Sequence, residues 1–179
     1  MTTDNILDNP NLDNLFIFAT ESADEKFEKH GKVPATFTCV GDHEIKSVGA
    51  WNLGTDEQRE RFDKCCRLLC VAEGARATVY IAEIWTVLAA SLDGLRPSQH
   101  PRRQECVAIR AELPGLRANC FYSILRDKAG KPKLGSPIGP ALVEPIDRGD
   151  QTLPIEIPSP AERMQAAMEL QQLLVISGN

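Results

Sequence analysis

Hydrophobic side chains recur along this chain with two periods, one typical of helices and one typical of strands. In residues 12–30 apolar positions are three or four apart, which predicts a helix with one buried face. These positions are Leu12, Phe16, Ala19, Ala23 and Phe27. Capping-box sequences begin at Thr55 and Ser159 and predict two further helices, ending near Gly74 and residue 177. In the last helix we expect an inward face made of Met164, Ala167, Met168 and Leu174.

Apolar runs between the helices have the length and composition of strands. Short polar turns separate them, including Gly41-Asp42-His43 and Pro114-Gly115, which are typical of hairpins. The predicted strands cover residues 35–40, 45–51, 77–90, 104–112 and 117–126. We therefore expect an α+β fold, with a five-stranded, largely antiparallel sheet flanked by three helices.

The domain boundaries follow from composition. Residues 1–10 are polar, and we expect them to be disordered, whereas residues 11–126 form the α+β core domain. Seven of the 12 prolines lie between residues 127 and 160. We therefore expect an extended arm over residues 127–158, part of which (141–146) lies along a sheet edge, where proline is tolerated. The helix over residues 159–177 is expected to pack on the same domain.

Charge and cysteine content narrow the functional classes. The net charge of −5 disfavours nucleic-acid binding and binding to anionic membranes, which both require a positive surface. There is no signal-peptide pattern and no apolar run of membrane-spanning length. We expect a cytoplasmic protein that does not enter the membrane, with its six cysteines present as thiols.

The strand predicted at residues 77–90 is apolar on both faces. An antiparallel sheet in a small monomer usually leaves one face in contact with water. Here both faces need cover, which helices or a second copy of the chain could provide. We therefore expect a homodimer, or else a complex with another protein.

Glu83 is the charge in the middle of this apolar strand, and it is the first candidate for chemistry. Together with His100 and Glu105 it could form a general acid–base or metal-binding group. The alternative is a structural ion pair between Glu83 and an arginine, which fixes the nearby loop. The adjacent Arg102 and Arg103 are candidates for an anion site, because guanidinium groups bind carboxylate and phosphate.

No cofactor fingerprint or metal knuckle is present in the sequence, so we predict neither a cofactor nor a metal site. Cys65, Cys66 and Cys70 are clustered, but their spacing is not that of a zinc site. We interpret them as buried thiols.

The pattern E-x-W at Glu83 and Trp85, followed by S-x-H-P-R-R-x-E from Ser98 to Glu105, resembles a pattern in small, uncharacterised prokaryotic and phage-type proteins. The order of elements is similar to that of roadblock and profilin-like folds. Neither resemblance implies an activity.

The leading interpretation is a small cytoplasmic interaction or regulatory module, dimeric and of phage or prokaryotic accessory type. The alternative is a hydrolase or metal-dependent enzyme that uses Glu83, His100, Arg103 and Glu105.

Overall fold

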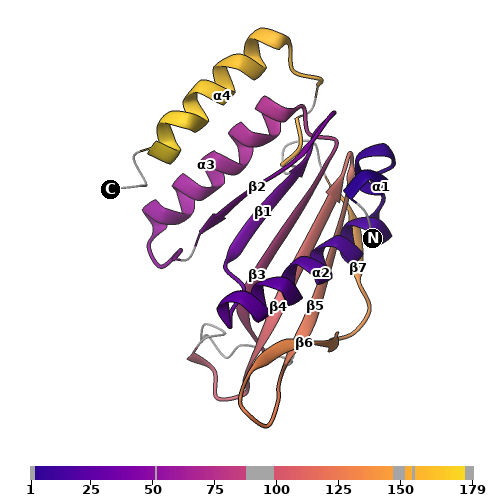
Figure 1. The fold of residues 1–179 in the computed structure, drawn as a ribbon, viewed down its shortest axis with the longest axis vertical. Coiled ribbons are helices and arrows are strands. Elements are labelled where there is room, and N and C mark those ends of the chain that lie inside the picture. The colour runs from indigo at the N-terminus through magenta and orange to yellow at the C-terminus, as the bar shows by residue number, and fades with distance from the viewer. Residues whose placement is uncertain (1–2, 51, 88–98, 147–151, 155, 176–179) are drawn as a thin grey trace.

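The computed structural model describes residues 3–50, 52–87, 99–146, 152–154 and 156–175. This part of the chain forms one antiparallel sheet and four helices (Figure 1). The helices are α1 (Thr3–Asp8), α2 (Leu12–His30), α3 (Asp56–Glu73) and α4 (Pro160–Val175). The strands are β1 (Ala35–Val40), β2 (Ile45–Ala50), β3 (Ala77–Val87), β4 (Arg103–Leu113), β5 (Leu116–Arg126), β6 (Pro132–Pro137) and β7 (Leu142–Pro145). The α+β prediction is confirmed, whereas the predicted counts of five strands and three helices are too low.

The strand order in the sheet is β2-β1-β3-β4-β5-β6, and β7 also pairs with β5. The predicted hairpin of β1 and β2 and the predicted meander of β3, β4 and β5 are both present. Trp51 and residues 88–90, which we placed in strands, lie outside the described residues, as does Ser98.

The two additional strands lie within the expected arm. β6 pairs with the end of β5 near Arg126, and β7 pairs with its beginning near Leu116. The expected edge position of residues 141–146 is thus confirmed, because β7 falls within it. The sequence pattern did not indicate these strands, because proline removes a ladder hydrogen bond and weakens the strand signal. In the structure they stand mainly at strand ends, where that loss costs least: Pro132, Pro137 and Pro145.

The additional helix, α1, lies where we expected disorder. Its residue Ile6 is only 2% exposed and belongs to the same apolar cluster as Leu15 of α2. Residues 1–10 are mostly polar, so their composition did not indicate that Ile6 is buried.

The longer helices begin and end where the sequence signals lie. The Thr55 side chain accepts a hydrogen bond from the Gln58 amide, and the Gln58 side chain accepts one from the Thr55 amide. Ser159 and Glu162 form the same capping box at the start of α4. Glycines with positive φ, Gly31 and Gly74, end α2 and α3, since glycine adopts the left-handed conformation without steric cost.

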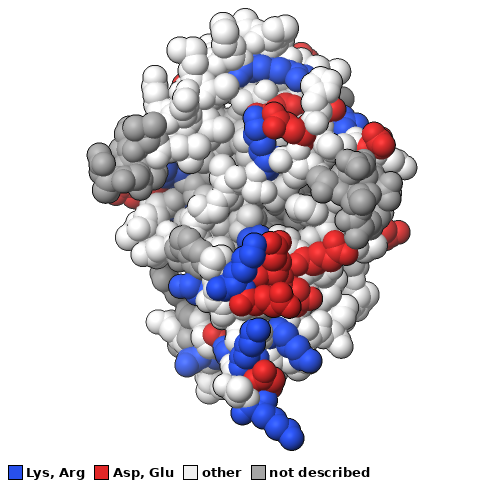
Figure 2. All heavy atoms as spheres, viewed as in Figure 1, with Lys and Arg blue, Asp and Glu red and all other residues white. Residues whose placement is uncertain are grey.

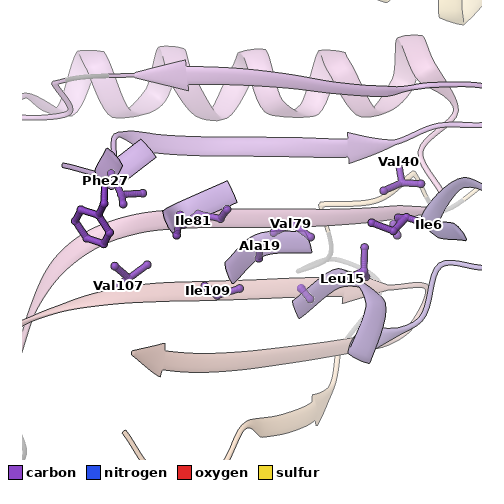
Figure 3. Close-up of a cluster of buried hydrophobic side chains, with 13 residues drawn as sticks. Ile6, Leu15, Ala19, Phe27, Val40, Val79, Ile81, Val107 and Ile109 are labelled. Atoms are coloured by element: carbon purple, nitrogen blue, oxygen red, sulfur yellow. The ribbon is translucent and has the colours of Figure 1, made fainter. Parts of the chain in front are cut away.

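Helices cover opposite faces of the sheet over different strands. α2 lies on one face over β3 and β4, and its buried side chains meet those of the strands (Figure 3). α3 packs on the other face against β1 and β2, through Phe62, Leu69 and the thiols of Cys65, Cys66 and Cys70. α4 runs beside α3 in the opposite direction (Figure 1). On the α3 side, therefore, helices cover one half of the sheet rather than all of it.

The predicted inward face of α4 is wrong. Met164, Met168 and Leu174 are 66%, 58% and 48% exposed, and Ala167 is exposed as well. The buried side chains are Ala166 and Leu170, at 5% and 9% exposure. This helix is apolar on both sides, so the spacing alone could not show which side faces the protein.

Charged side chains are mixed rather than segregated on the face shown in Figure 2, where acidic and basic residues lie next to one another. Among the described residues, no helix is long and apolar enough to cross a membrane.

Candidate functional site

Glu83 lies on the α2 side of the sheet, in the second half of β3. Its Oε1 accepts a hydrogen bond of 2.6 Å from the backbone amide of Val33. Val33 is buried and follows α2 in the chain. Within the described residues the partner of Glu83 is therefore this amide, rather than the arginine that the structural interpretation named. The bond ties the end of α2 to the sheet.

His100 and Glu105 have separate partners. The Nδ1 atom of His100 accepts a hydrogen bond of 3.0 Å from the amide of Arg102, and the side chain is buried. Glu105 forms an ion pair of 3.0 Å with Arg126 of β5. No hydrogen bond or ion pair joins the side chains of Glu83, His100 and Glu105 within the described chain. Over that same part of the chain, no three His, Cys, Asp or Glu side chains are grouped so that they could hold a metal ion.

The adjacent arginines are not arranged as a pair. The guanidinium of Arg103 lies over the ring of Trp85, 5.0 Å from its centroid, which is a favourable cation–π geometry. Arg102 is exposed, and its backbone amide is bound to His100. The anion site at Arg102 and Arg103 stays a prediction. The geometry gives Arg103 a second role, since its guanidinium shields one face of the Trp85 ring.

A concave site lies on the opposite face of the sheet, between α3 and the strands that α3 leaves uncovered. It is an open cavity of about 570 Å³. We call it the α3 groove. Its described lining residues are Phe37, Leu53, Arg59, Phe62, Asp63, Cys66, Arg67, Thr78, Tyr80, Arg110, Glu112, Arg117 and Thr152.

Two rungs of the sheet form the floor of the groove. In one rung Phe37, Tyr80, Arg110 and Asn119 stand side by side on β1, β3, β4 and β5. In the next rung, Thr78, Glu112 and Arg117 are aligned in the same way. Side chains of paired residues lie on the same face of a sheet, so each rung changes from an uncharged residue on β3 to a charged residue on β4.

Glu112 is the carboxylate that sequence reasoning missed. It is 1% exposed. Its Oε1 accepts a hydrogen bond of 2.8 Å from Nε of Arg117 and forms an ion pair of 2.8 Å with Nη2 of the same residue. Its Oε2 accepts a hydrogen bond of 3.0 Å from the amide of Thr152. Glu112 therefore anchors the chain at residue 152 to the β4–β5 hairpin. The sequence contained a signal for the pairing of Glu112 with Arg117, because the two residues flank the Pro114-Gly115 turn at positions that pair in a hairpin.

Burial raises the pKa of two groups in the groove, a phenol and a thiol, and keeps both neutral. Burial raises the pKa of the Tyr80 hydroxyl, and nearby Cys66 and Asp63 raise it further, whereas Arg110 opposes them. Burial also raises the pKa of the Cys66 thiol far above its ordinary value. A thiol held protonated is a poor nucleophile, so Cys66 contributes an apolar wall rather than a reactive group.

The exposed apolar face of α4 is a second candidate site. We call it the α4 stripe and define it as Met164, Ala167, Met168 and Leu174. The opposite face of the helix is anchored to the protein through Leu170, and through an ion pair of 2.8 Å between Arg163 and Asp42. The α4 stripe is therefore presented outward by a fixed helix.

Comparisons with protein-family models, with curated proteins and with solved structures found no match to this chain. The resemblances to phage-type proteins and to roadblock and profilin-like folds stay predictions.

Proposed function

We propose that this protein is a small interaction module that self-associates through the α4 stripe. The observation that supports the proposal is the exposure of three large apolar side chains on one helix, Met164, Met168 and Leu174. Contiguous exposed apolar surface marks interaction sites in soluble proteins, and methionine is enriched at such sites because it adapts to its partner.

A second copy of the chain fits the stripe better than a charged partner does. The three charged residues of α4 already have partners within the chain. Glu162 caps the helix at Ser159, Arg163 is paired with Asp42, and Glu169 accepts a hydrogen bond from Gln165. None of these charged residues belongs to the stripe, so two stripes that meet place apolar side chains against each other, which matters for a chain of net charge −5.

The geometry favours a weak, two-fold symmetric dimer. Ala167 lies near the middle of the stripe, where a small side chain lets two helices approach closely. A helix of 16 residues is about 24 Å long, so the shared surface lies at the low end of specific interfaces. We expect a dimer that dissociates at micromolar concentrations.

The six cysteines support the proposed cytoplasmic location. All are free and buried, which is typical of proteins kept under reducing conditions.

Sedimentation equilibrium tests the proposal over a range from about 1 µM to about 0.5 mM, which spans the expected dissociation constant. We expect the native chain to dimerise and Met168→Glu to be monomeric throughout. The matched control is Ile17→Glu, because Ile17 is also an exposed apolar residue (43% exposed) on a helix. A native chain that is monomeric at every concentration, or a Met168→Glu variant that still dimerises, would overturn the proposal.

A further inference from the structure

We infer that the α3 groove binds a small organic monoanion, a carboxylate with an apolar body. This site is separate from the α4 stripe, and the inference does not depend on dimerisation. The groove volume of about 570 Å³ lies within the range of small-molecule sites.

The apolar end of the groove lies between α3 and β1. Phe37 on the floor, Phe62 on α3 and Leu53 in the preceding loop line this end. The rings of Phe62 and Tyr80 are tilted, with centroids 6.3 Å apart. Aromatic and aliphatic walls of this kind hold the apolar body of a ligand.

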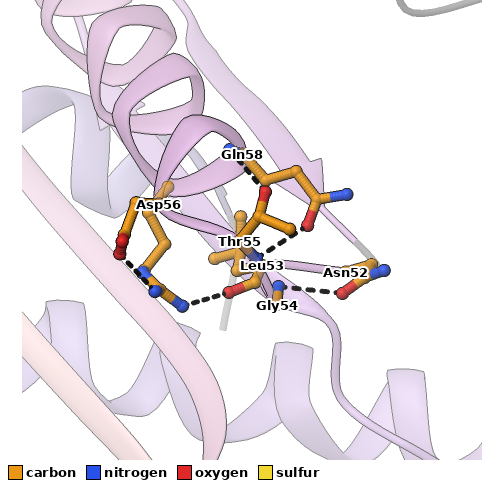
Figure 4. Close-up of polar contacts among 7 residues, drawn as sticks. Asn52, Leu53, Gly54, Thr55, Asp56 and Gln58 are labelled. Carbon is orange, nitrogen blue, oxygen red and sulfur yellow. Dashed lines mark hydrogen bonds and ion pairs between the residues drawn. The ribbon is translucent and has the colours of Figure 1, made fainter.

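The loop that carries Leu53 is held in place by the start of α3 (Figure 4). Arg59 donates a hydrogen bond of 2.7 Å to the carbonyl of Leu53 and is paired with Asp56. The amide of Gly54 donates to Asn52, 2.9 Å away. This rim is therefore formed before any ligand arrives, which lowers the entropic cost of binding.

The charged end of the groove lies at Arg110. The Nε atom of Arg110 donates a hydrogen bond of 3.0 Å to Oδ1 of Asn119, which orients the guanidinium. The two terminal nitrogens form no hydrogen bond or ion pair with the described part of the chain, so they can bind a carboxylate. Arg59 and Arg117, by contrast, are already bound to protein oxygens.

Tyr80 lies between the two ends, because it pairs with Phe37 on one side and with Arg110 on the other. Its hydroxyl forms no hydrogen bond within the described chain. Burial raises its pKa, so the hydroxyl keeps its proton at neutral pH and can donate it to a carboxylate oxygen beside Arg110.

The balance of charges favours a ligand with one negative charge. The described lining has four arginines, Arg59, Arg67, Arg110 and Arg117, and two carboxylates, Asp63 and Glu112. Arg59 is paired with Asp56, and Arg117 with Glu112. The remaining balance is Arg67 and Arg110 against Asp63, an excess of one positive charge that is complementary to a monoanion. Asp63 on the α3 wall would repel a second negative charge, which disfavours phosphates and dicarboxylates.

Titration with benzoate, followed by amide chemical shifts in NMR, tests the inference. We expect saturable shifts at the groove with a dissociation constant on the order of 1 mM, as suits a ligand of this size. Benzamide, which has nearly the same shape but no charge, should bind at least about tenfold more weakly.

Variants separate the charged end from the general surface. Arg110→Gln should weaken benzoate binding by about tenfold or more, and Tyr80→Phe should weaken it to a smaller extent. Arg126→Gln is the matched control, because Arg126 is a β5 arginine paired with Glu105 outside the groove.

Three outcomes would overturn the inference: no saturable binding of benzoate, equal binding of benzoate and benzamide, or equal losses in Arg110→Gln and Arg126→Gln. A monomeric Met168→Glu variant that still binds benzoate would show that the groove and the α4 stripe act separately.

Discussion

Glu83 shows how a charged residue in an apolar strand can serve the fold through the backbone. Its carboxylate binds the amide of Val33, which lies 50 positions earlier in the chain. A buried amide without an acceptor is costly, and the turn after α2 provides no closer partner. The strand pattern identified Glu83 as unusual, but a contact over this sequence distance could not be read from spacing.

This role predicts different effects for two substitutions. Glu83→Gln keeps an oxygen that can accept from Val33 and should lower the free energy of unfolding by less than about 1 kcal/mol. Glu83→Ala leaves the amide unpaired and should lower it by about 1–3 kcal/mol. Urea denaturation measures both. Equal losses in the two variants would contradict the assigned hydrogen bond.

The starts of α3 and α4 and the end of α3 were predicted correctly because they depend on interactions between residues that are close in the sequence. The capping boxes and the end of α3 at Gly74 depend on neighbours within four positions. Glu112 illustrates the opposite case. Its pairing with Arg117 could be inferred from the turn between them, but its contact with Thr152 depends on where the chain returns after β7.

At the scale of the element, α4 shows the limit of hydrophobic periodicity. Ala166, Leu170 and Leu173 form one apolar side, and Met164, Ala167, Met168 and Leu174 form the other. Larger side chains occupy the outward face, so the pattern favoured the wrong side. The contacts with α3 decide the orientation, and those contacts are not encoded in the spacing of α4 itself.

A pair of leucine substitutions tests this orientation. Leu170 is 9% exposed and Leu174 is 48% exposed. Leu170→Ala should lower the free energy of unfolding by about 2–4 kcal/mol, since it removes buried methyl groups and leaves a cavity. Leu174→Ala should cost less than about 1 kcal/mol in the monomer. Both can be measured by denaturation at low protein concentration, and a larger loss at Leu174 would reverse the assignment.

At the scale of the molecule, α2 and α3 stabilise different halves of one sheet from opposite sides. The described interior is mainly aliphatic, and it also contains buried thiols and two partly buried phenols. Burial raises the pKa of the Cys106 thiol to about 11. Burial, with a contribution from Cys120, raises the pKa of the Tyr122 hydroxyl to about 12.

These shifts predict a loss of stability in alkaline solution. In the unfolded chain the two groups titrate near 9 and 10. Above these values the unfolded state has released protons that the folded state retains, so rising pH favours unfolding. The contribution of these two protonated groups to the free energy of unfolding should be complete at pH 7. It should be lost progressively from about pH 9 upward.

Urea denaturation at pH 7, 9 and 10 under reducing conditions would measure this loss. Cys106→Ala should reduce the slope above pH 9, because it removes one of the shifted groups. A free energy of unfolding that stays constant through this range would contradict the prediction.

The composite edge formed by β6 and β7 affects how the folded protein behaves in a crowded solution. Two short segments, bounded by prolines, occupy the side of β5 that would otherwise present one continuous row of amides and carbonyls. Such a row is a template on which further strands can add, as in amyloid growth. The proline-rich arm therefore protects this side of the sheet against fibril formation.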